Sequence, residues 1–117
     1  MKDIIHDAVR NALVKDGWTI TDDPLDLELE DLFLRADLGG ERALAAERGL
    51  NTIGVEIKSF LQPSMTSDVY RMIGQFLVYR AVLRETDPQR ILYIALPRAA
   101  YRMMIGTLGY WLALSEI

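Results

Sequence analysis

The sequence contains no cysteine and only one histidine, His6. The first absence excludes disulfide bonds and thiolate zinc sites, and the second excludes a metal site built from several histidines. No apolar run approaches the length that spans a membrane, and the N-terminus carries no signal-peptide pattern. We therefore expect a cytoplasmic protein that has no membrane partner.

The 117 residues carry a net charge of −4, which argues mildly against a protein that coats nucleic acid regardless of its sequence. The charge is unevenly distributed, because residues 1–57 sum to −7 and residues 58–117 to +3. A basic second half could contact phosphates while an acidic first half holds cations, or both could be solvated surface without a partner. The length suits one compact domain with a core of its own.

Hydrophobic periodicity predicts an alternation of helices and strands. Helices are expected over 5–13, 64–85 and 98–107. Extended segments are expected at 18–21, 25–29, 32–38, 53–60 and 91–96. Asp3 is a suitable N-cap for the first helix and Gly17 a suitable stop, whereas Asp87-Pro88 breaks the second helix. Residues 41–48 fit a helical turn or the arm of a hairpin equally well.

This order indicates an α/β (α+β) fold with a mixed sheet and a helix on each side. The continuous apolar run at 91–96 is typical of a central strand covered on both faces. The connection from 53–60 through the long helix to 91–96 predicts parallel pairing with a right-handed crossover.

The stretch GVEIKSF, residues 54–60, sets a glutamate and a lysine into an otherwise apolar strand. Strand alternation places Glu56 and Lys58 on one face, roughly 7 Å apart, opposite the face of Val55 and Ile57. One interpretation is a half-exposed strand with a polar face. The other is a catalytic pair.

Asp37 adds a second acid, because the strand expected at 32–38 would carry it beside Glu56 if the two strands pair as a meander. Two carboxylates alone repel each other, and a divalent cation with hard oxygen ligands, Mg²⁺ or Mn²⁺, removes this conflict. The backbone carbonyl of Ile57 would supply a third ligand. Lys58 would be a point charge that orients a water or stabilises negative charge on a phosphate. These are the parts of a metal-assisted site for phosphodiester hydrolysis.

The arrangement resembles the PD-(D/E)xK nuclease superfamily, whose restriction-endonuclease-like core has the same order of helix, meander, helix and strand. Asp37 matches the isolated acid of that family, and Glu56-Ile57-Lys58 matches its ExK element. Ala36 stands where the family pattern has a proline, which is a departure from the motif.

Gln75 and Tyr79 lie at i and i+4 on the helix expected over 64–85. They match the Q-x-x-x-Y element of RecB-like members, and the resemblance implies that they position substrate or a metal-bound water. Taken singly, Gln75 fits a surface residue and Tyr79 a core aromatic with an exposed hydroxyl.

Longer segments narrow the resemblance, namely KDIIHDAVRNALVKDGWTITDDPL, DLGGERALAAERG and the series VEIKSF…GQFLVYR…RILYIALP. Together they resemble the fdxN element excision-controlling factor family, XisH, over nearly all of residues 2–97. The resemblance implies DNA as a partner, a programmed DNA rearrangement in cyanobacteria and a small companion protein, XisI. Family members usually continue past the last helix, so we expect residues 1–117 to form a single nuclease-like domain that lacks a C-terminal edge strand. A missing edge strand favours a companion protein or a homodimer.

Three further polar residues accompany this set. A helical wheel places His6 at the border of the buried stripe and Asp7 toward solvent, so His6 is the candidate nearer the site. The superfamily resemblance instead points to Asp7, because an acid on the first helix often reaches the metal. A histidine that borders a core is also a common structural residue. Arg35 could contact phosphate or pair with a neighbouring acid.

Three functions remain open from the sequence. The first is a Mg²⁺- or Mn²⁺-dependent DNA endonuclease, and it predicts that Glu56 and Lys58 lie in a shallow cleft against the Gln75–Tyr79 face, partly shielded from water. The second is a catalytically inactive module of nuclease fold that binds DNA or a companion protein such as XisI, which the acidic total charge favours. The third is purely structural, with Glu56 and Lys58 as exposed surface charges.

Overall fold

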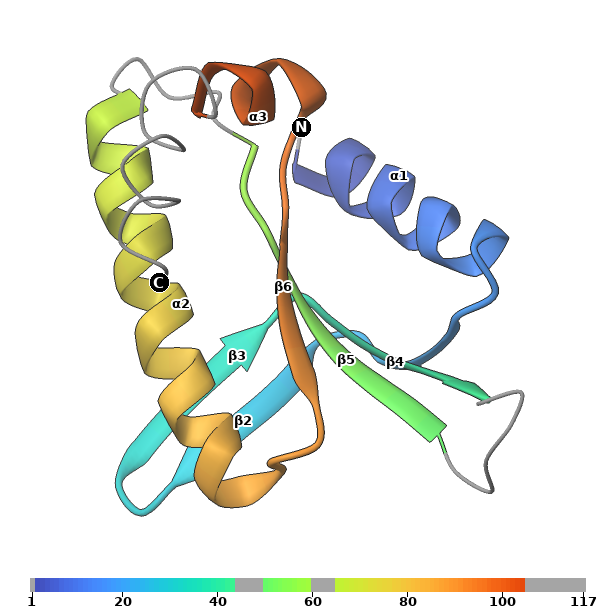
Figure 1. Cartoon of the computed structure of the whole chain (residues 1–117), viewed down its shortest axis with the longest axis vertical. Helices are drawn as coiled ribbons and strands as arrows, with labels where there is room; N and C mark the ends of the chain where they lie inside the picture. Colours follow the sequence, from blue (N-terminus) through green and yellow to red (C-terminus); the bar gives the residue numbers. More distant parts are fainter. Residues whose placement is uncertain (1, 44–49, 60–64, 105–117) are drawn as a thin grey trace.

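The computed structural model describes residues 2–43, 50–59 and 65–104, whose core is a four-stranded mixed sheet (Figure 1). Its strands stand in the order β1-β4-β5-β6, and a separate hairpin pairs β2 with β3. The elements in chain order are α1 (Lys2–Lys15), β1 (Thr19–Asp22), β2 (Leu25–Leu29), β3 (Leu32–Ala36), β4 (Leu38–Ala43), β5 (Leu50–Ile57), α2 (Met65–Thr86), β6 (Ile91–Ala95) and α3 (Arg98–Met104). α1 covers one face of the sheet, and α2 with the hairpin covers the other (Figure 1). The expected mixed α+β fold is confirmed.

α1 packs an apolar stripe on the sheet and ends at a left-handed glycine. Val9 and Leu13 pack against the buried residues of β4 and β5. Gly17 has φ +94°, and its N–H donates to the carbonyl of Val14 at 3.1 Å, which confirms the predicted helix stop. The N-cap prediction is wrong, because the helix already includes Lys2 and Asp3 therefore lies within its first turn.

The strand expected at 32–38 consists of two strands that separate at Asp37. β3 pairs with β2, ending at Leu25 opposite Ala36, whereas β4 pairs with β1 and β5 and begins at Leu38 opposite Val55. The chain thus changes sheets at Asp37, which a local alternation of apolar residues does not reveal. Residues 41–43 belong to β4, in favour of the hairpin arm, and residues 44–49 lie outside the described part of the chain.

Two glycines allow the hairpin to approach the sheet closely and the Asp22 side chain of β1 to approach β4. Gly39 and Gly54 are partners across β4 and β5. A Cβ atom on Gly54 would lie 3.1 Å from Cδ2 of Leu25, and one on Gly39 would lie 2.9 Å from Oδ2 of Asp22. With no side chains in the way, the hairpin packs onto this face and forms one core with α2, comprising Leu25, Leu27, Ala36, Tyr79, Val82, Leu83 and Leu92.

The connection from β5 through α2 to β6 has the predicted parallel pairing. α2 extends from Met65 to Thr86 and ends before Asp87-Pro88, as the sequence predicted. α3 follows β6 directly and is described as far as Met104, so the expected end of this helix at residue 107 lies outside the described residues. None of the helices that the structure describes has the length and apolarity needed to span a membrane.

The prediction that residues 91–96 form a central strand covered on both faces is wrong. β6 is the last strand of the sheet within the described residues, and the side chains of Ile91 and Tyr93 are 53% and 50% exposed. They pair with Ile53 and Val55, whose side chains face α1, but α1 covers β4 and β5 more than β6. The apolar composition of residues 91–96 does not distinguish a strand at the centre of a sheet from one at its edge.

Candidate functional site

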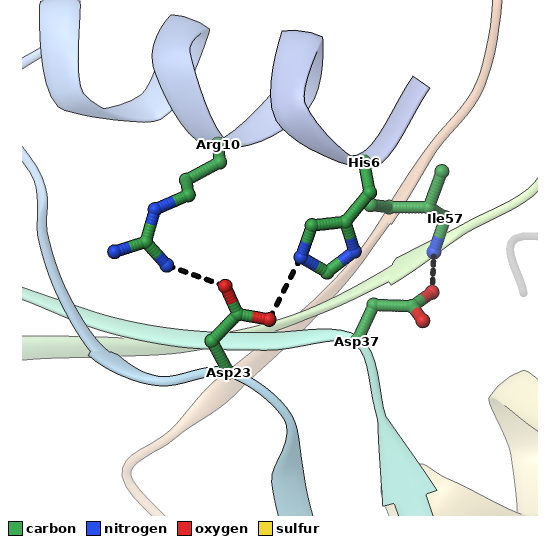
Figure 2. A network of polar contacts seen from close by, with 5 residues as sticks. All are labelled: His6, Arg10, Asp23, Asp37 and Ile57. Atoms are coloured by element: carbon green, nitrogen blue, oxygen red, sulfur yellow. Dashed lines mark hydrogen bonds and ion pairs between the residues drawn. The ribbon is translucent and has the colours of Figure 1, made fainter. Parts of the chain in front are cut away.

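Asp37 is held beside β5 by a backbone hydrogen bond. The N–H of Ile57 donates to Oδ2 of Asp37 at 2.7 Å (Figure 2). If the β4–β5 ladder continued past Leu38 and Val55, Ile57 would lie opposite Ala36, but Ala36 has left to pair with β2. The change of sheets therefore frees one donor at the end of β5, and the Asp37 carboxylate accepts from it.

The carbonyl of Ile57 faces the same side as Asp37. The N–H of Lys58 donates to the carbonyl of Ala95 on β6 at 2.9 Å. In a trans peptide the C=O of one residue and the N–H of the next point in opposite directions, so the Ile57 carbonyl points away from β6 and toward Asp37. The backbone oxygen predicted as a ligand thus faces the side on which the acid lies.

Glu56 is buried on the α2 face of β5 without full compensation of its charge. Its exposed fraction is 6%, Oε2 lies 3.5 Å from Nζ of Lys58, and Oε1 has no hydrogen-bond partner. The pKa of Glu56 is raised to about 7, because burial and the Asp37 carboxylate raise it by more than Lys58 lowers it. One lysine therefore does not offset the cost of two adjacent acids in a poorly solvated place.

The third, structural interpretation required Glu56 and Lys58 to be exposed surface charges. The Glu56 and Lys58 side chains are only 8% and 17% exposed, so this interpretation is wrong. The alternation of β5 does place the pair on the face opposite Val55, but α2 and the hairpin cover that face. The predicted shielding from water is thereby confirmed.

Tyr79 and Gln75 lie beside the two acids. Tyr79 is 7% exposed, and its hydroxyl donates to the carbonyl of Arg35 at 3.3 Å. Burial raises the pKa of Tyr79, the charges of Glu56 and Asp37 raise it further, and a hydrogen bond with Gln75 lowers it. Tyr79 therefore lies near Glu56 and Asp37, and Gln75 is its hydrogen-bond partner on the same helix.

Unpartnered oxygens mark this side of α2. Within the described residues, the buried side-chain atoms without a hydrogen-bond partner are Oε1 of Glu56, Oε1 of Gln75 and Oδ2 of Asp68. Sequence reasoning missed Asp68. The signal was available, because Asp68 precedes Gln75 by seven residues and so lies on the same helical face, two turns away. All three atoms are acceptors, so an occupant of this region must offer hydrogen-bond donors or positive charge.

The residues present fit a hard divalent cation. In the described ranges no three His, Cys, Asp or Glu side chains gather as metal ligands would. The predicted set has two carboxylates, Asp37 and Glu56, and the Ile57 carbonyl, and water molecules commonly complete the shell of Mg²⁺. Burial and the Asp37 carboxylate both raise the pKa of Glu56, and a bound cation would stabilise the charged form against both effects.

His6 belongs to a neighbouring polar network. Its Nε2 lies 2.7 Å from Oδ1 of Asp23, and Arg10 pairs with the other oxygen of the same carboxylate (Figure 2). The half-buried His6 and the exposed Asp7 agree with the helical wheel. Among the described residues no hydrogen bond joins His6 to Asp37.

Of the two roles predicted for Arg35, phosphate contact and a salt bridge with a neighbouring acid, the structure shows the salt bridge. Its Nε donates to Oδ1 of Asp26 at 2.9 Å across the β2–β3 hairpin, and both side chains are largely exposed. The alternative of a salt bridge with a neighbouring acid is therefore confirmed.

Comparison with known proteins gives a consistent assignment. The family model described as XisH protein matches residues 1–113. A crystal structure of a fdxN element excision controlling factor protein from Anabaena variabilis is 35% identical, with a TM-score of 0.82, and the match covers 98% of this chain and 86% of that one. An XisH family protein from Nostoc punctiforme PCC 73102 is 34% identical, also with a TM-score of 0.82, over 97% of this chain and 86% of that one. A search of curated proteins finds no match. By family model and by structure, the chain belongs to the XisH family.

Proposed function

We propose that this protein is a divalent-cation-dependent DNA phosphodiesterase of the PD-(D/E)xK type that acts in the excision of a DNA element. Excision follows from the family, since the Anabaena relative is described as an element excision controlling factor. The observation that carries the chemistry is Glu56, which is buried beside Asp37 with Oε1 unpartnered. A buried acid in this state suits a cation site better than a structural one.

Asp37, Glu56 and the carbonyl of Ile57 are the groups that would hold Mg²⁺ or Mn²⁺. The bound ion would neutralise phosphate charge and make an attacking water more acidic. Lys58 supplies a fixed positive charge beside Glu56, suited to a phosphate oxygen on which negative charge develops. The side chain of Lys58 is 17% exposed, so it keeps access to a ligand from solvent.

Tyr79 and Gln75 position the reacting groups rather than transfer protons. The raised pKa of Tyr79 keeps its hydroxyl protonated at neutral pH, so Tyr79 donates to the carbonyl of Arg35 and holds Gln75 in place. Gln75 is held by its hydrogen bond to Tyr79 and has Oε1 free to orient a water. α2 and the hairpin exclude bulk water, which strengthens each of these interactions.

Nicking of supercoiled plasmid DNA in Mg²⁺ or Mn²⁺ tests this proposal. Wild type should nick the plasmid only with the metal, and Lys58→Ala should slow nicking about a hundredfold, as expected for loss of one electrostatic contact in a transition state. Lys15→Ala, which removes an exposed lysine at the far end of α1, is the matched control and should nick normally. Equal nicking by wild type and Lys58→Ala would contradict the proposal.

A second candidate function is a binding module for an XisI-like companion protein. The observation in its favour is β6, which is the last strand of the sheet among the described residues and carries neither charge nor proline, while Ile91 and Tyr93 are half exposed. Exposed edges of this kind commonly pair with another chain. A companion that adds to this edge should be lost in Tyr93→Lys but retained in Phe33→Lys, a control at an exposed aromatic of the hairpin.

Size-exclusion chromatography of the chain with and without the companion distinguishes the outcomes. Loss of the complex in Tyr93→Lys alone supports a companion at β6. If wild type elutes as a dimer by itself and Tyr93→Lys elutes as a monomer, the edge binds a second copy of the chain instead. Unchanged complexes in both variants would remove β6 as the binding edge.

A further inference from the structure

The long helix α2 is apolar on both of its faces. Residues 72–83 read MIGQFLVYRAVL, in which Gln75 and Arg80 are the only side chains with an amide or a charge. One face of the helix packs into the core that it shares with the hairpin and the sheet, through Tyr79 and Val82 among others. A helix that is apolar all round is normally covered all round. An apolar face that points away from this core is therefore unexpected unless a partner covers it.

Five uncharged residues form the outer face of α2, namely Tyr70, Gly74, Leu77, Val78 and Ala81. All five are exposed, and the three large side chains among them are 73%, 46% and 44% exposed, in chain order. Spacings of three and four residues make them neighbours along about three turns, and Leu77 lies about 160° around the helix from Tyr79. α2 stands at the outside of the fold, with the sheet and the hairpin on its other side (Figure 1). Isolated exposed apolar residues are common, but a contiguous row of them is typical of a contact surface.

Gly74 has no packing role within the fold. A Cβ atom there would meet nothing within 4 Å, so no neighbour requires a glycine at this position. Glycine also destabilises the interior of a helix relative to alanine. Gly74 and Ala81 are both small, and they lie on either side of the bulky pair Leu77 and Val78. The outer face therefore lets a second helix approach closely at two points around a central apolar contact.

The outer face is complementary to itself when two copies of α2 run antiparallel. A two-fold axis that passes between Leu77 and Val78 brings each of these side chains beside the same side chain of the second copy. Gly74 precedes this centre by as many residues as Ala81 follows it. Gly74 of one copy thus comes level with Ala81 of the other, so both close approaches occur in the same arrangement.

The charges beside the outer face match in this arrangement too. Arg71 and Glu85 are exposed, and they lie on the flank of the outer face that carries Val78, near its two ends. The two-fold axis brings the same flank of both helices together, so Arg71 of each copy comes near Glu85 of the other. Within the described part of the chain neither residue forms an ion pair. A parallel pair of helices would instead place equal charges at the same height, which is unfavourable.

We infer that the outer face of α2 binds a second copy of this chain, as an antiparallel two-fold pair of α2 helices. The surface that one helix offers is small for a protein interface, so the dimer should be weak, with a Kd in the micromolar range, and the separate copies should stay folded. Gln75 and Tyr79 lie on the other side of α2, so each copy keeps its site free of this contact. The contact is independent of the proposed hydrolysis and differs from the edge of β6.

Sedimentation equilibrium over a series of protein concentrations tests the contact without DNA or metal. Wild type should show a monomer–dimer equilibrium, and Leu77→Glu should raise the Kd at least about tenfold, because it buries two like charges beside the axis. Ile4→Glu is the matched control, since it places the same charge at an apolar side chain of α1 that is 72% exposed, and it should dimerise as wild type does. Both positions are exposed, so equal melting temperatures at low concentration should verify that the fold is intact.

The absence of native cysteine allows a direct test of the orientation. Val78→Cys places one thiol beside the same thiol of the second copy, so mild oxidation should give a disulfide-linked dimer. Tyr70→Cys should not cross-link, because the two thiols of an antiparallel pair would lie roughly 22 Å apart along the helices. Cross-linking at both positions would indicate parallel helices and overturn the arrangement.

The other occupants of this face give different results. Dimerisation that is lost in Leu77→Glu and kept in Ile4→Glu and Tyr93→Lys supports the contact. Dimerisation that is lost only in Tyr93→Lys assigns self-association to β6 and refutes it. A wild type that is monomeric at every concentration refutes it as well, and a lower melting temperature of Leu77→Glu would then show that another part of the chain covers the face.

The outcome also separates this contact from the proposed function. Dimerisation through α2 without metal-dependent nicking would support the contact and contradict the hydrolytic function. Nicking that depends on Lys58, by a protein that stays monomeric, would do the reverse.

Discussion

Glu56 illustrates how one side chain is placed in an unfavourable state by the residues around it. Its carboxylate lies on the covered face of β5, near a second acid that the Ile57 N–H holds in place. Lys58 contacts one of its oxygens and leaves the other without a partner. A carboxylate in such surroundings either takes up a proton or binds a cation. Proton uptake should therefore be visible when no metal is present.

The pH dependence of stability in a chelator measures that proton uptake. The pKa of Glu56 is raised to about 7 in the fold from an ordinary value of 4.5, so the folded state binds more protons than the unfolded state between these values. Glu56 therefore contributes to the free energy of unfolding at low pH, and this contribution is lost as pH rises through about 7. Glu56→Gln removes the effect, so its free energy of unfolding should exceed that of wild type by on the order of 1–3 kcal/mol at pH 8 and less at pH 4.5.

Urea unfolding of both proteins at the two pH values gives this difference. Glu28→Gln, which replaces an exposed acid, serves as the control. Its effect on the free energy of unfolding should be the same at the two pH values. A stability gap between Glu56→Gln and wild type that does not grow with pH would contradict the assigned state of Glu56.

The residues of the site were largely predictable, but their environment was not. The motif placed Asp37, Glu56, Lys58, Gln75 and Tyr79 together because each matched a family element at the right spacing. The burial of Glu56 depends on how the hairpin and α2 cover β5, which no local pattern encodes. Asp68 was missed because a single acid on a helix usually faces solvent, although its spacing of seven residues from Gln75 placed it on the same helical face, where its buried oxygen has no partner.

At the scale of elements, features set by adjacent residues were predicted correctly, and features set by distant partners were not. The stop at Gly17 and the break after Thr86 follow from the chemistry of one or two residues. The split of 32–38 into β3 and β4 depends on two different pairing strands. The exposure of β6 likewise depends on its place at the side of the sheet, which is a property of the assembled fold.

The glycines provide a test of how closely the elements approach. Gly54→Ala places a Cβ atom 3.1 Å from Leu25 Cδ2 between the sheet and the hairpin, so it should destabilise the fold by about 1–3 kcal/mol. Gly74→Ala is the counterpart, because a Cβ there meets nothing within 4 Å. On the exposed side of α2 it should stabilise the fold by about 0.5–1 kcal/mol through helix propensity. Urea midpoints at constant m-value should therefore move in opposite directions, and a shift of both in the same direction would contradict the packing described.

The whole molecule combines an acidic first half with a basic second half. Asp37 and Glu56 come from residues 1–57, which sum to −7, while Lys58, Gln75 and Tyr79 come from residues 58–117, which sum to +3. The sheet joins the two halves where β5 ends, so the acids that suit a cation lie beside cations that suit phosphates. This polarity supports a site at which DNA and a metal ion meet.

The most direct test of the central claim, that Asp37 and Glu56 form a divalent-cation site, is the change in melting temperature on adding Mg²⁺ or Mn²⁺ to metal-free protein. An ion that binds only the folded state stabilises it by mass action, by about 2.7 kcal/mol at a hundred times its dissociation constant. Wild type and the control Glu28→Gln should gain equally, and Glu56→Gln and Asp37→Asn should not gain. If Glu56→Gln gains as much from the metal as wild type, the ion binds elsewhere and the account of this site is wrong.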